Sequence, residues 1–144
     1  MAAEIATMRV NEQLDAMEAM GVSPVSYLIV PRVIASTLMM PLLSAIFLGL
    51  GLIGCYILGV IMFRIDTSVF VAQLQWLVWV SDIQKGLVKA LVFGFIIATI
   101  ACFKGFYARG GAKGVGEATT QAVVSSLLTI LIVDFFISLA QMKG

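Results

Sequence analysis

The residues of this 144-residue chain that could do chemistry are few, and half of its acidic residues lie within the first twenty positions. Carboxylates act as general acids, general bases or metal ligands, but the chain contains no histidine, the commonest partner in such sites. Cys55 and Cys102 stand alone in apolar surroundings without CxxC spacing. No hydrolytic or nucleotide-binding motif has its required spacing. We therefore expect no catalytic residue, metal site or cofactor, and any nucleotide to be bound by another chain.

Asp134 is the acidic residue in the most apolar surroundings, within the run ILIVDFFISLA near the end of the chain. A carboxylate inside a bilayer is costly and usually faces the interior of a helix bundle or a watery cavity. Two interpretations stay open: a functional intramembrane group, or an interfacial carboxylate paired with a neighbouring helix. A lipid-modifying enzyme would need a polar cluster here, and the sequence offers only one carboxylate.

The first stretch, residues 2–31, is the one long segment polar enough to work outside a bilayer. Its apolar stripe at helical spacing consists of Ala3, Ala6, Val10, Leu14 and Met17, and its opposite face of Glu4, Glu12, Asp15 and Glu18. We expect this amphipathic helix to end at Gly21, ahead of Pro24. The pattern allows a helix lying on the membrane surface, or a short rigid element that transmits the movement of a soluble motor.

Composition places the rest of the chain in a membrane. The chain is 61% hydrophobic and 12% charged, which is more apolar surface than a soluble core of this size can bury. With a net charge of +1 and no long basic run, the sequence shows no basic segment of the kind that binds nucleic acid. The expected fold class is all-α integral membrane, with an amphipathic cytoplasmic helix, about three transmembrane helices and a short interfacial helix.

We expect one membrane domain over residues 1–144. After a first helix and linker at 1–31, the segments are a span at 33–63 with a kink at Pro41, an interfacial segment at 64–86, a span at 87–103, a basic glycine-rich loop at 104–117 and a span at 118–142. Trp76 and Trp79 suit the headgroup region. The small residues Gly49, Gly51, Gly54 and Gly59 favour close helix packing within the subunit, with a dimer interface as the alternative.

Two stretches resemble a known family. Residues 3–35, AEIATMRVNEQLDAMEAMGVSPVSYLIVPRVIA, are similar to the signature of the MlaE (YrbE) family, the permeases of bacterial ABC transporters that move phospholipids together with MCE-domain proteins. Residues 114–128 and 133–140, GVGEATTQAVVSSLL and VDFFISLA, resemble the closing segment of the same family. The first stretch also loosely resembles the EAA loop of ABC importers, but Pro31 falls too early for that motif.

The resemblance implies a function and a set of partners. It implies a multi-pass permease of the bacterial inner membrane that moves phospholipids between the inner and outer membranes and so serves outer-membrane lipid asymmetry. The subunit would be a transporter and not an enzyme, working as a homodimer with a separate ABC ATPase, an MCE-domain protein and a small STAS-domain subunit. The residues matching the coupling signature, which would contact the ATPase or shape that contact, are Glu4, Arg9, Glu12, Gln13, Asp15, Glu18 and Gly21.

The match is incomplete at the amino-terminal side. Members of the family carry an interfacial helix and two more spans ahead of the coupling helix, so we expect this chain to be a fragment of a larger subunit or to have a wrong start. The alternative function is a small membrane scaffold or assembly protein without transport activity.

Overall fold

A computed structural model describes residues 1–142 apart from Val78, and this part of the chain forms an all-α fold. Three helices are long and apolar enough to cross a membrane: Val25–Met62, Val80–Phe106 and Gly111–Met142. The expected fold class is thereby confirmed. The first helix has 38 residues, and at about 1.5 Å per residue it extends about 57 Å, well beyond a hydrocarbon core of about 30 Å. It is therefore steeply tilted or reaches past the lipid chains.

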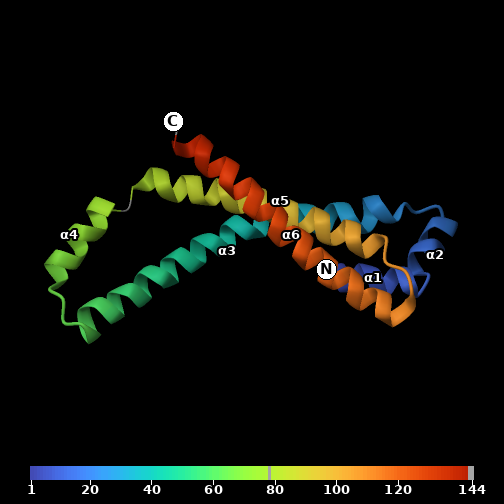
Figure 1. Cartoon of the computed structure of the whole chain (residues 1–144), viewed down its shortest axis with the longest axis horizontal. Coiled ribbons are helices and arrows are strands. Elements are labelled where there is room, and N and C mark those ends of the chain that lie inside the picture. The colour runs from blue at the N-terminus through green and yellow to red at the C-terminus, as the bar shows by residue number, and fades with distance from the viewer. Residues whose placement is uncertain (78, 143–144) are drawn as a thin grey trace.

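The described elements follow one another as α1 (Ala2–Val10), α2 (Gln13–Ala19), the π-helical turn η1 (Val25–Ile29), α3 (Val30–Tyr56), a second π-helical turn η2 (Ile57–Met62), α4 (Thr67–Leu77), α5 (Val80–Phe106) and α6 (Gly111–Met142). In Figure 1, α3 and α5 lie side by side near α1 and α2 and diverge toward α4, while α6 crosses α5. The α1–α2 segment and α4 thus occupy opposite ends of the molecule.

Small residues bring α5 and α6 together. On α6 the buried residues are Gly114, Ala118, Ala122 and Ser126, one on every turn. On α5 they are Ala90, Gly94, Ala98, Ala101, Cys102 and Gly105. Small side chains let helix backbones approach closely where lipid supplies no hydrophobic drive for association.

Helix α1 is embedded between α5 and α6. Ile5 and Ala6 are completely buried. Ala6 packs with Ala108 and Ala118, and Ile5 packs with Cys102, which joins α1 to both long helices. One face of α1 is thus buried against the two long helices, while Ala3, Glu4 and Thr7 on its other face are exposed.

The single amphipathic helix expected over residues 2–20 is two helices. The chain breaks at Asn11 and Glu12, and Glu12 has a φ of 58°, in the left-handed region. The break turns α2 away from α1 while Leu14 returns to the core at 1% exposure. The expected apolar stripe is correct for Ala6 and Leu14, but Ala3 is exposed, because the buried face of α1 consists of Ala2, Ile5 and Ala6.

Several segment boundaries differ from the expected ones. Pro41 lies inside α3 without ending it, and the irregular π-helical turns are at the two ends of this long helix instead. Helix α5 begins at Val80, within the segment expected to be interfacial, and α4 occupies the rest of that segment up to Leu77. The expected glycine-rich loop is short, because Gly114 is buried against the bundle and α6 already begins at Gly111.

The glycines of α3 do not pack as expected within this chain. A Cβ atom added at Gly49, Gly51 or Gly54 would meet no atom within 4 Å. At Gly59 it would lie 3.2 Å from the ring of Phe70 on α4. The close helix contacts are instead at glycines of α5.

Gly105 provides a test of the α1–α5 contact. A Cβ atom there would lie 2.7 Å from the carbonyl oxygen of Ala2 and 3.0 Å from Cβ of Ile5. We predict that Gly105→Ala lowers the free energy of unfolding in detergent by about 1–3 kcal/mol, the usual cost of overpacking. Gly86→Ala on the same helix meets no atom within 4 Å and should be neutral or stabilising by about 0.5–1 kcal/mol. Equal stability of the two variants would contradict the embedded position of α1.

Candidate functional site

Helix α2 is the most exposed polar element at its end of the molecule (Figure 1). Its seven residues are preceded by the left-handed Glu12 and followed by Gly21, whose φ is +79°. This is the conformation expected of Gly21 at a helix end. Leu14 anchors α2 in the cluster around Ile5 and Cys102. One buried side chain and two left-handed residues thus hold α2 at a defined angle to the bundle.

Three of the predicted coupling residues make ion pairs inside the chain. Arg9 on α1 donates a hydrogen bond to Asp15 on α2. Arg32 at the start of α3 lies 2.6 Å from Glu4 on α1. The guanidinium of Arg9 also stands 5.8 Å from the ring centroid of Phe106 at the end of α5. These contacts tie the α1–α2 segment to the long helices, so the three residues shape this surface, although Glu4 and Asp15 are themselves exposed.

The other predicted residues face outward. Glu12, Gln13 and Glu18 are exposed and form no ion pair in the described part of the chain. Met20, which follows α2, is 73% exposed. The exposed surface of α2 and of the residues that flank it thus carries two carboxylates, an amide and an apolar side chain.

Asp134 is paired across two membrane helices. Its Oδ1 atom lies 2.7 Å from Nζ of Lys89 on α5, and Nζ also donates to Oγ of Ser138 at 2.8 Å. The side chains of Lys89 and Asp134 are 23% and 46% exposed. At about 1.5 Å per residue, Lys89 lies about 22 Å along α5 from Lys104, toward the far side of a hydrocarbon core of about 30 Å. The negative charge of Asp134 is thus balanced by Lys89 on the neighbouring helix.

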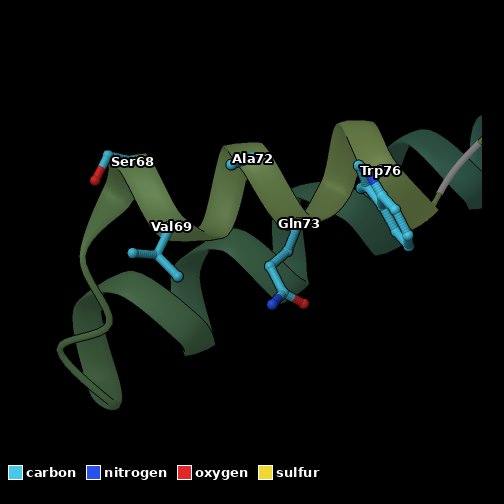
Figure 2. A pocket seen from close by; sticks show the side chains of 5 residues that line it. All are labelled: Ser68, Val69, Ala72, Gln73 and Trp76. Atoms are coloured by element: carbon cyan, nitrogen blue, oxygen red, sulfur yellow. The ribbon is translucent and has the colours of Figure 1, made fainter.

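A hollow of about 820 Å³ lies along one face of α4, at the opposite end from α2. Figure 2 shows the side chains that line it: Ser68, Val69, Ala72, Gln73 and Trp76. None of these residues is charged, and Trp76 is 84% exposed. A helix of this neutral, tryptophan-containing kind is typical of the headgroup region.

Sequence reasoning missed the partners of the charged residues and the helix contacts. The charged residues are visible in the sequence, but the pairing of Arg32 with Glu4 and of Lys89 with Asp134 depends on how the helices pack. The signal for the contacts was the recurrence of Gly, Ala or Ser at every fourth position of α6 and along α5. That spacing is the sequence pattern of closely packed membrane helices.

The fold and this surface define a helical membrane protein whose short charged helix is held at the end of its long spans. The chain belongs to the Permease MlaE family, whose model matches residues 1–140. This confirms the resemblance seen in the sequence.

The chain is similar to several curated proteins. It is 47% identical over 143 residues to a probable ABC transporter permease protein of Synechocystis, covering 99% of this chain and 54% of that protein. It is 44% identical over 137 residues to a probable ABC transporter permease protein of Rickettsia typhi, covering 95% and 53%. It is 42% identical over 137 residues to the chloroplastic protein Trigalactosyldiacylglycerol 1 of Arabidopsis thaliana, covering 95% and 39%. The chain spans about half the length of the two bacterial relatives.

The Lys89–Asp134 pair makes a prediction about stability. Asp134→Leu leaves the Lys89 ammonium without its counter-charge between two helices, so we expect a loss of about 1–3 kcal/mol, below the value for a fully buried pair because Asp134 is nearly half exposed. The double variant Lys89→Leu with Asp134→Leu should recover most of the loss, since an apolar pair replaces the ion pair. Unfolding in detergent measures both. A double variant no more stable than Asp134→Leu would show that the pair does not act as a unit.

Proposed function

We propose that this chain is part of the membrane permease of an ABC transporter that moves phospholipids, and that α2 is where a separate ATPase docks. The observation that carries the proposal is the combination of an outward acidic face on α2 with a rigid attachment of α2 to the spans. Family membership and the names of the bacterial relatives support a permease of an ABC transporter.

The attachment explains how a displacement of α2 would reach the membrane. Leu14 and the Arg9–Asp15 pair fix α2 to α1. Helix α1 is packed between α5 and α6, and Glu4 ties it to Arg32 at the start of α3. A push on α2 by an ATPase would therefore move the ends of all three long helices together. Such a connection is what turns hydrolysis on one chain into a change of cavity shape on another.

Phospholipid is the substrate that the resemblance favours. The Arabidopsis relative is named after a galactolipid, which fits lipid as the substrate class. We further propose, on the resemblance alone, a homodimer in a bacterial inner membrane that works with an MCE-domain protein and a small STAS-domain subunit in outer-membrane lipid asymmetry.

The docking surface is tested by charge reversal. We predict that Glu12→Lys with Glu18→Lys in the complete permease lowers ATPase retention and lipid transfer in reconstituted vesicles by about tenfold, because two interfacial charges change sign. The matched control is Asp66→Lys with Asp82→Lys, which reverses two exposed carboxylates that flank α4 at the other end. Normal ATPase retention in the α2 variant would remove the docking proposal and favour a scaffold without transport activity.

Gly21 tests whether the angle of α2 matters. Gly21→Val would place a β-branched residue at a φ of +79°, although the added Cβ meets no atom within 4 Å. The cost is backbone strain of about 1–3 kcal/mol, so the turn would rearrange and we expect ATP hydrolysis to continue with reduced lipid transfer. Gly21→Asn, which tolerates the left-handed conformation, should preserve transfer. Equal transfer by both variants would show that the turn geometry is not needed.

A further inference from the structure

A separate pocket of about 310 Å³ lies where α5 ends and α6 begins, and the proposed ATPase docking does not use it. Its side-chain lining includes Phe103, Lys104, Tyr107, Arg109, Glu117 and Gln121. It combines two cations, an acid, an amide and two aromatic rings at the junction of two membrane helices.

The positive charges in this pocket are available to bind an anion. Lys104 Nζ donates a hydrogen bond to Oε1 of Gln121 at 3.4 Å, and neither Lys104 nor Arg109 forms an ion pair in the described part of the chain. The carboxylate of Glu117 lies 3.8 Å from Nζ of Lys113, one turn earlier on α6. The one acid of the lining thus already has a cationic partner outside the pocket, while the two cations of the lining have none.

The pocket is at the boundary between lipid and water. Lys104 is the first charged residue of α5 after an uncharged, largely apolar run that extends from residue 90 to 103. Gln121 stands at the same level on α6, immediately before the apolar run 122–133. Phe103 and Tyr107 are 58% and 62% exposed, and their ring centroids are 4.9 Å apart. An apolar flank thus adjoins a cationic pocket at the depth of lipid headgroups.

We propose that this pocket binds an anionic phospholipid, with its phosphate held between Lys104 and Arg109 and its acyl chains along Phe103 and Tyr107. Basic pockets between membrane helices recognise anionic headgroups in this way, and a guanidinium matches the geometry of phosphate oxygens. Ala108, beside the pocket, packs on Ala6 of α1 and Ala118 of α6. A lipid bound here therefore adjoins the end of the bundle that holds α1.

The test uses the complete permease in nanodiscs of phosphatidylcholine containing a minor fraction of phosphatidylglycerol. Native mass spectrometry after gentle release measures the enrichment of phosphatidylglycerol on the protein. We expect Lys104→Gln or Arg109→Gln to lower this enrichment about fivefold and the double variant about 25-fold, because each cation near the surface contributes a factor of this size. Lys104→Arg with Arg109→Lys keeps both charges and should retain binding.

Lys85→Gln is the matched control, because it removes one exposed positive charge from α5 but lies outside the pocket lining and forms no ion pair in the described part of the chain. Enrichment should be unchanged in this variant. An equal loss in Lys85→Gln would show a general effect of the protein's net charge, and no loss in the double variant would show that the pocket is not used; either result overturns the proposal. Displacement of phosphatidylglycerol by excess inorganic phosphate would also overturn it, since a site for free phosphate would not need the apolar flank.

Discussion

The packing of α1 between α5 and α6 is the contact on which the rest of the arrangement depends. Close approach is set by Gly105 on α5 and by Ala118 and Ala122 on α6, because these small residues leave space for Ala2, Ile5 and Ala6 of α1. In lipid, helices associate through such van der Waals contacts and not through a hydrophobic drive. Without this contact, α2 would not be held at a fixed position relative to the membrane-spanning helices. A force applied to α2 would then move only the connecting loop and would not reach those helices.

Ion pairs between helices fix the relative orientation of the packed elements. Arg9–Asp15 sets α2 against α1, Glu4–Arg32 sets α1 against α3, and Lys89–Asp134 joins α5 to α6 near the opposite side of the membrane. The first two pairs are partly exposed and contribute modestly to stability. Their main effect is on geometry, because each pair fixes the position of one helix along its neighbour. The α5–α6 pair itself is joined near one end by Lys89–Asp134 and near the other by the hydrogen bond from Lys104 to Gln121.

The fold class could be predicted from the sequence, because three long apolar stretches with few charges are typical of an all-α membrane protein. The sequence also identified Gly21 as a left-handed helix end and Asp134 as an unusual carboxylate. It was not sufficient for the break at Glu12, since a non-glycine residue in the left-handed region is set by tertiary contacts of Leu14 and Ile5 and not by local propensity. For the same reason, sequence alone could not show that Glu4, Arg9 and Asp15 form ion pairs with one another or with Arg32, because the paired residues are 6 to 28 positions apart.

The central claim is that α2 receives the ATPase and that the buried α1 transmits its movement. Amide hydrogen exchange of the complete permease, with and without its ATPase, tests this most directly. We predict that binding slows exchange at Gln13–Ala19 and at Gly21, while amides of α1, already enclosed between α5 and α6, change little. Protection confined to α4 at the opposite end, or none at α2, would contradict the account.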